Sequence, residues 1–167
     1  MKSKKTAVSD KSSGSKSSHK KQVLGFIKKF DPKIAKLVTE VRSALRRRYP
    51  TAIELVYDNY NALAIGLSPT EKTSDAFVSI AVYARGVNLY FIHGAKLTDP
   101  QRLLEGNGNQ GRFFRVQSAA DVATPPVLEL LTAAIRFGEV PLPSGTHGYT
   151  VVKSISAKQR PRRPVKR

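Results

Sequence analysis

Segment 93–112, HGAKLTDPQRLLEGNGNQGR, contains the residues whose types most readily support a ligand site. His93, Asp99 and Glu105 offer one imidazole and two carboxylates, ligand types that suit iron and other transition metals. No fixed spacing links these residues, so a histidine that bonds a backbone carbonyl at the end of a strand is the competing interpretation. We keep His93, Asp99 and Glu105 as a candidate metal site.

Three glycines in the same segment, Gly106, Gly108 and Gly111, match the pattern G-x-G-x-x-G. A dinucleotide-binding fingerprint follows a strand and opens a helix. Here a short helix is predicted before the glycines and a strand after them, so no nucleotide cofactor is expected. The backbone N–H groups of Gly108 and Gly111 could instead form an anion-binding concavity with Arg112 and Arg115. Surface ion pairing is the alternative role for these arginines.

No catalysed reaction is specified by the sequence. Cysteine is absent, which excludes a disulfide framework, a thiolate metal site and a cysteine nucleophile. The chain also lacks G-x-x-x-x-G-K-[ST], H-E-x-x-H and any marked Ser, His and acid arrangement. An enzyme that places His93, Asp99 and Arg112 in one pocket under segment 93–112 stays as a second alternative.

The formal net charge of +17 is concentrated at the two ends of the chain. Residues 1–21 carry seven lysines and one aspartate, and residues 153–167 carry seven Lys or Arg and no acid. Such segments contact phosphates without reading bases, so we expect them to bind nucleic acid or another polyanion, with solubility as the alternative role. Most Tyr and Phe fall in predicted strands, and no aromatic stacking platform is evident. The expected contact residues are Lys4, Lys5, Lys20, Lys21, Arg160, Arg162 and Arg163.

The composition predicts one domain between two disordered basic tails. Residues 1–21 alternate Lys with Ser and Gly and offer little apolar surface to bury, and residues 153–167 combine cations with two prolines. We therefore predict tails at 1–21 and 153–167 and a domain over 22–152. The apolar runs are far shorter than the roughly 20 residues that span a bilayer. With no secretory h-region, a cytoplasmic location and no membrane partner are expected.

Two amphipathic helices are predicted. The first starts at Pro32 with Asp31 as its N-cap, shows apolar residues at spacings of three and four, and closes on the arginines at 46–48. The second lies within 118–137, where Gly138 can end it. A further short helix through 101–104 can follow Asp99-Pro100.

Five strands are predicted from short β-branched or aromatic runs separated by turn residues. Connections this short force antiparallel pairing, since a parallel crossover needs a dozen or more residues. The expected fold is therefore α+β, an antiparallel sheet of about five strands flanked by an N-terminal and a C-terminal helix. The predicted strands cover residues 52–57, 62–67, 76–83, 87–92 and 112–116.

Residues 87–112 resemble the YdhG-like domains, a family of unknown function in which some members are named frataxin-like iron chaperones. The resemblance extends more loosely over residues 23–137. It implies an antiparallel sheet flanked by helices and, for the chaperone members, iron held by exposed carboxylates. The motifs that carry it are Val87-Asn88-Leu89-Tyr90-Phe91, His93-Gly94, Leu97-Thr98-Asp99-Pro100, Leu103-Leu104-Glu105-Gly106 and Gly108 through Gly111-Arg112.

Two functions from different classes follow from these patterns. The leading hypothesis is a non-catalytic binding or accessory module without a cofactor, whose basic tails contact nucleic acid or another polyanion. The alternative is a frataxin-like chaperone that binds iron. The predicted first helix carries Lys33, Lys36 and Arg42, and this positive charge opposes Fe²⁺ binding.

Overall fold

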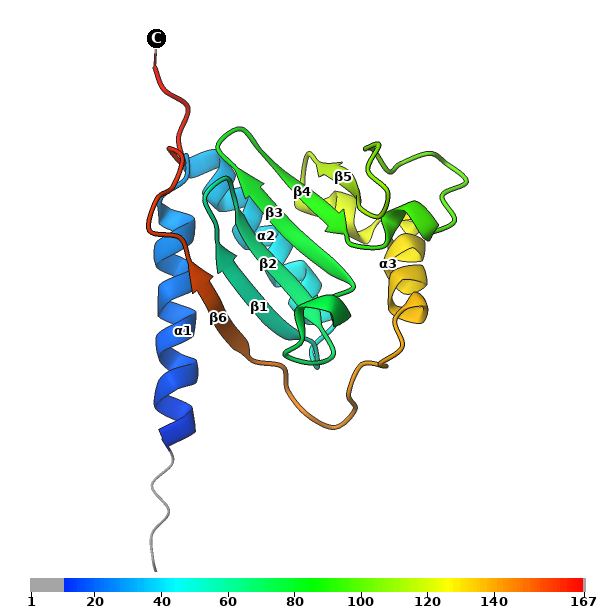
Figure 1. The fold of residues 1–167 in the computed structure, drawn as a ribbon, viewed down its shortest axis with the longest axis horizontal. Helices are drawn as coiled ribbons and strands as arrows, with labels where there is room; N and C mark the ends of the chain where they lie inside the picture. The colour runs from blue at the N-terminus through cyan, green and yellow to red at the C-terminus, as the bar shows by residue number, and fades with distance from the viewer. Residues whose placement is uncertain (1–10, 167) are drawn as a thin grey trace, which may run out of the picture.

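The structure of the protein, a computed structural model, describes residues 11–166. Within these residues the chain forms three α-helices, six strands and three short 3-10 helices (Figure 1). No helix in the described part is long and apolar enough to cross a membrane. The helices are α1 (Lys11–Lys28), α2 (Pro32–Arg48), α3 (Pro125–Phe137), η1 (Thr73–Asp75), η2 (Gly94–Lys96) and η3 (Ala119–Ala123); the strands are β1 (Ile53–Asp58), β2 (Leu63–Ser68), β3 (Val78–Tyr83), β4 (Gly86–Phe91), β5 (Arg112–Val116) and β6 (Thr150–Ile155).

The six strands form one mixed sheet in the order β5-β4-β3-β2-β1-β6. The first five pair antiparallel with their neighbours, as the short turns between most of them require. β6 pairs parallel with β1, and the long path through α3 and the following loop makes that direction accessible. The predicted α+β class and the five predicted strands are confirmed. The prediction of a purely antiparallel sheet was wrong because β6 was missed.

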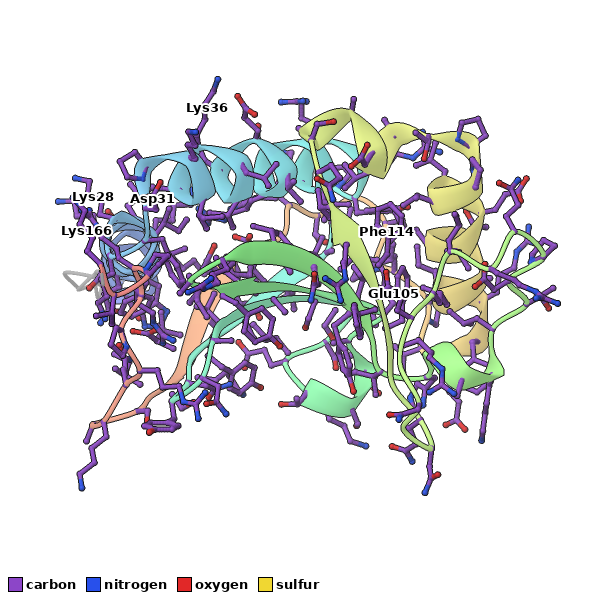
Figure 2. All side chains as sticks on the ribbon, turned by 90° about the horizontal axis from the view of Figure 1, so that it is seen from above. Lys28, Asp31, Lys36, Glu105, Phe114 and Lys166 are labelled. Carbon is purple, nitrogen blue, oxygen red and sulfur yellow. The ribbon has the colours of Figure 1, made fainter. Side chains whose placement is uncertain are left out.

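Helices α2 and α3 lie on the same face of the curved sheet (Figure 2). The Asp31 carboxylate accepts a hydrogen bond from the Lys33 N–H at 3.0 Å, which confirms the predicted N-cap. Gly138 is the C-cap of α3, also as predicted. Alternate residues of the strands point to these helices and form the core. They are Val56, Leu63, Ile65, Leu67, Val78, Ile80, Val82, Val87, Leu89 and Phe91.

The two predicted domain boundaries fall inside regular structure. The boundary at 21/22 lies within α1, which begins at Lys11, and the boundary at 152/153 lies within β6. Helix α1 buries Val23, Phe26 and Ile27, and it packs against α2 and β6. Figure 1 shows α1 running along the outside of β6, so this helix covers an edge of the sheet.

The predicted short helix through 101–104 does not form. The Asp99 carboxylate accepts hydrogen bonds from the N–H groups of Leu103 at 2.9 Å and Leu104 at 2.8 Å. Arg102 takes a φ of 52°, a left-handed conformation that a helix does not contain. Asp99 thus closes a tight turn instead of capping a helix.

Gly148 allows the chain to enter β6. Its N–H donates to the Pro50 carbonyl at 2.8 Å, and an added Cβ would lie 1.8 Å from the Ala52 carbonyl oxygen. Since that neighbour is backbone, it cannot rotate away, and the start of β6 would have to move.

We predict that Gly148→Ala destabilises the protein by about 1–3 kcal/mol or more. Urea unfolding followed by circular dichroism measures the change. Gly108→Ala is the matched control, because its added Cβ would meet nothing within 4 Å. This control should stay within about 0.5 kcal/mol of the wild type. Equal unfolding midpoints for the two variants would contradict the docking of β6 beside Ala52.

Candidate nucleic-acid interface

The three candidate metal ligands are engaged separately. The His93 ring packs on Phe137 with 5.1 Å between ring centroids. Asp99 is occupied by the backbone N–H groups of its own turn, and the Glu105 carboxylate pairs with Arg115 at 3.1 Å. Among the described residues, no group of three or more His, Asp or Glu side chains could hold a metal ion. The structure therefore does not bring this predicted set together.

The glycine-rich segment presents carbonyl oxygens to Arg112. The Nη1 atom of Arg112 donates to the carbonyls of Gly111, at 2.7 Å, and Gly108. Arg115 pairs with Glu105, and its guanidinium carbon lies 5.7 Å from the centroid of the Phe113 ring. An anion at this position would have to displace these contacts.

The residues named for an enzymatic pocket do not line one shared space. His93 lines a cavity of about 310 Å³ together with Asp75, Phe137 and Glu139. Asp99 lines a different groove beside Pro126. Arg112 lines neither of these two spaces.

The described parts of the two basic stretches, α1 and residues 156–166, lie along one edge of the molecule. The segment after β6, residues 156–166, passes the C-terminal end of α1 (Figure 1). Lys29 donates from Nζ to the Gln159 side-chain oxygen at 3.1 Å, and Arg163 Nε donates to the Lys29 carbonyl at 3.3 Å. Figure 2 places the labelled Lys28 and Lys166 at this same end.

A buried carboxylate fixes this arrangement. The side chain of Asp58, at the end of β1, is 0% exposed and pairs with Lys29 and Arg162, each at 2.8 Å. Burial by itself raises the pKa of Asp58, but hydrogen bonds from Lys29, Gln159 and Arg162 outweigh it and hold the pKa below its usual range. The C-terminal segment is thereby tied to both β1 and α1.

The predicted contact residues differ in their surroundings. Lys20, Lys21, Arg160 and Arg163 are exposed. Arg162 is buried in the ion pair with Asp58, which withdraws its guanidinium from solvent. Lys4 and Lys5 lie outside the described residues.

We call the exposed cations of α1 and of the C-terminal segment the basic edge. Neither stretch 11–30 nor stretch 153–166 contains Asp or Glu, so these cations have no acidic neighbours along their own segments. The basic edge consists of Lys16, Lys20, Lys21, Lys28, Lys158, Arg160, Arg163 and Lys166.

A second buried carboxylate joins α2 to the sheet. Glu54 on β1 is 1% exposed and accepts hydrogen bonds from Arg42 and Arg46, each at 2.7 Å. Thr150 at the start of β6 donates to the same carboxylate at 2.8 Å. Burial raises the pKa of Glu54, but the hydrogen bond and charge of Arg42, with the charge of Arg46, outweigh it and lower the pKa overall. Glu54 therefore stays ionised at neutral pH.

The face of the sheet opposite α2 and α3 carries a broad groove of about 730 Å³. Its floor is made of small residues on the central strands, including Ala64, Ser79 and Ala81. We call it the tyrosine groove, because Tyr57, Tyr60, Tyr83 and Tyr90 line it. The sequence prediction assigned Tyr57, Tyr83 and Tyr90 to strands and missed the groove. The usable signal was their alternation with core residues, which puts Tyr57, Tyr83 and Tyr90 on the face away from the core.

Searches against protein-family models, curated proteins and solved structures gave no match to this chain.

We expect stability to fall at acidic pH through Glu54. A carboxylate whose folded pKa is depressed stabilises the protein above its unfolded pKa, about 4.3 for Glu. That stability is lost as pH falls through the lower folded value. Glu54→Gln should be less stable than the wild type at pH 7 and should lose less stability between about pH 5 and pH 3. Urea midpoints across this range test it.

Glu129→Gln, an exposed site on α3, controls for the loss of one carboxylate. It should keep the pH profile of the wild type. A Glu54→Gln profile parallel to that of the wild type over the whole range would contradict the assignment to Glu54.

Arg162→Ala should destabilise the protein by about 1.5–3 kcal/mol, the usual loss for a hydrogen bond to a charged group. Removal of this side chain leaves the buried Asp58 with Lys29 as its remaining cation and frees the C-terminal segment. Arg163→Ala is the matched neighbour, exposed in the structure, and should change stability by less than about 0.5 kcal/mol. Equal effects, measured by urea unfolding, would show that Arg162 is no anchor.

Proposed function

We propose that this protein is a non-catalytic nucleic-acid-binding module that contacts phosphate groups through the basic edge. The observation that carries the proposal is the juxtaposition of two cationic segments that are more than a hundred residues apart in sequence. Exposed lysines of α1 and exposed Lys and Arg of residues 156–166 lie on one connected surface. A surface with this excess of cations favours a polyanion.

The length of α1 in the basic edge matches several phosphate spacings of a nucleic-acid strand. Helix α1 has 18 residues, which corresponds to a length of about 27 Å at 1.5 Å per residue. One strand of B-DNA places a phosphate every 3.4 Å or so along the axis, so roughly eight phosphates of one strand match this length. Several contacts can therefore form at once.

The anchoring of the C-terminal segment to Asp58 also favours binding. Arg162, Gln159 and Lys29 hold the C-terminal segment against Asp58, so the neighbouring cations project from a fixed backbone. Binding then costs less conformational entropy than it would for a free tail. The buried carboxylate of Asp58 is already neutralised by its partners and offers little repulsion to a phosphate.

The resemblance to YdhG-like domains implies an antiparallel sheet flanked by helices, and the observed sheet differs from that expectation in the parallel strand β6. The iron-binding alternative has weaker support because His93, Asp99 and Glu105 each have other partners. The enzymatic alternative has weaker support because His93 and Asp99 line separate spaces.

The proposal predicts that Lys20→Glu combined with Lys21→Glu raises the dissociation constant for a fluorescein-labelled 20-base-pair DNA by about tenfold or more. It should also reduce the slope of log K against log salt by about 2, since each lysine that no longer pairs with a phosphate lowers the slope by about 1. Fluorescence anisotropy measures both quantities at salt concentrations from about 50 to about 300 mM. This range brackets the physiological ionic strength of about 0.15 M.

Lys33→Glu combined with Lys36→Glu is the matched control, because these exposed lysines of α2 change the net charge equally at another site. This control should weaken binding only about two- to threefold through long-range electrostatics. Equal losses in both double variants would mean that net charge, and not the basic edge, determines binding. Salt-independent binding by the full chain would refute the proposed function.

A further inference from the structure

The tyrosine groove joins the basic edge directly. The Arg160 N–H donates to the Tyr60 carbonyl at 2.9 Å, and the Arg160 guanidinium carbon lies 5.7 Å from the Tyr60 ring centroid. Ser156, at the start of the C-terminal segment, lines the groove. The same stretch of chain thus forms one rim of the groove and part of the basic edge.

The strand register explains the shape of the groove. Tyr57 on β1 pairs with Ala64 on β2, and Ala64 pairs with Ala81 on β3. Tyr90 on β4 pairs with Ser79 on β3. Strand β2 and the part of β3 that holds Ser79 and Ala81 therefore separate Tyr57 on β1 from Tyr90 on β4, two strands about 14 Å apart at three interstrand spacings. Tyr83 stands at the end of β3. A flat, shallow floor between aromatic walls results.

Contacts with neighbouring residues hold Tyr57 and Tyr90 in place. The Tyr57 hydroxyl is hydrogen-bonded to the Thr73 hydroxyl in η1. The Tyr90 ring lies against Gly111, where an added Cβ would come within 1.9 Å of the Tyr90 hydroxyl. Tyr83 and Tyr90 nonetheless remain 42% and 38% exposed. The Tyr90 ring is therefore both positioned and accessible, and the Tyr83 ring is accessible.

The chemistry of the lining favours a neutral, planar group attached to a negatively charged chain. In the described part of the protein, no Asp or Glu lines the groove, whereas Asn59, Asn61 and Ser79 supply neutral donors and acceptors. At the far side, Arg115 on β5 projects from the same face as Tyr90, as the pairing of Tyr90 with Phe113 and of Asn88 with Arg115 requires. Arg115 is ion-paired there with Glu105 at 3.1 Å, so among the described residues the flanking cation without a carboxylate partner is Arg160, on the opposite side of the groove.

We infer that the tyrosine groove binds the unpaired bases of a single-stranded nucleic acid, which stack on Tyr83 and Tyr90 while its phosphates contact the basic edge. This inference rests on the proposed function and names its substrate class. Stacking on aromatic side chains requires bases that are not already stacked in a duplex, so the groove discriminates single strands from double strands. Such stacking tolerates every base, since each has a flat π-face.

The test compares two single-stranded probes with the same number of phosphates, a fluorescein-labelled 12-nucleotide oligothymidine and a 12-nucleotide oligomer with abasic sites throughout. The full chain should bind the oligothymidine more tightly than the abasic probe. Tyr83→Ala and Tyr90→Ala should each weaken oligothymidine binding by about 5- to 150-fold, the range for loss of one stacked base. Affinity for the abasic probe and the salt dependence should stay as in the wild type.

Two control variants separate stacking from a general loss of structure. Tyr83→Phe retains the ring and should bind within about twofold of the wild type if stacking is the interaction. Phe137→Ala removes an exposed aromatic ring that lies outside the groove, and it should leave both affinities unchanged. Loss of binding in Phe137→Ala, or retained oligothymidine binding in both Tyr→Ala variants, would overturn the inference.

The two proposals fail in different ways. If the basic edge does not bind nucleic acid, neither probe binds. If the basic edge binds but the groove does not, both probes bind equally and the tyrosine variants change nothing. If the groove instead pairs two copies of this chain, light scattering will show a dimer that Tyr83→Ala converts to a monomer, and the inference is overturned.

Discussion

The Asp58 carboxylate is fully buried, and a buried negative charge is tolerated only where cations and hydrogen-bond donors surround it. Its ion pairs join three distant parts of the chain, because Lys29 follows α1, Asp58 ends β1, and Arg162 lies after β6. This one carboxylate therefore joins the C-terminal segment both to β1 and to the end of α1. Without it, Lys29 and the buried Arg162 would have no anion between them.

Glu54 has a parallel role at the other end of β1. It draws Arg42 and Arg46 from α2 onto the sheet and accepts a hydrogen bond from Thr150 of β6. Both carboxylates are therefore shared between β1 and the chain at or beyond β6. Ionic contacts thus reinforce the parallel strand pair, whose backbone pairing alone is slightly less stable than antiparallel pairing. The cations of this protein fall into two groups: a few that hold the fold together, and many that face solvent.

Local patterns were sufficient for much of the fold. Asp31-Pro32 and the apolar spacing after it specify α2, and the β-branched runs specify five strands, because these signals act over a few residues.

The predicted metal and anion sites had no such support, since Asp99 and Arg112 find partners in their own loop. The partnership of Asp58 with Arg162 spans a sequence separation of 104 residues and leaves no local signal. The cations that follow Val152 led to the prediction of a tail from residue 153, and strand β6 was therefore missed. The groove could be predicted only in part. Strand alternation puts the tyrosines on one face of the sheet, but it does not show which face the helices leave uncovered.

The position of β6 in the chain bears on how the protein folds. Strand β1 cannot pair with its outer neighbour β6 until the chain has grown well beyond it, since Glu54 and Thr150 are 96 residues apart. Pairings of this kind close large loops and form late, after hairpins such as β1 with β2. During synthesis on the ribosome, the β1 edge thus stays unpaired until β6 arrives, whereas α1, which packs on β6 and α2 in the folded protein, has already been made. Helix α1 would then be available to pack on β6 in the nascent chain before its lysines form part of the basic edge in the folded protein.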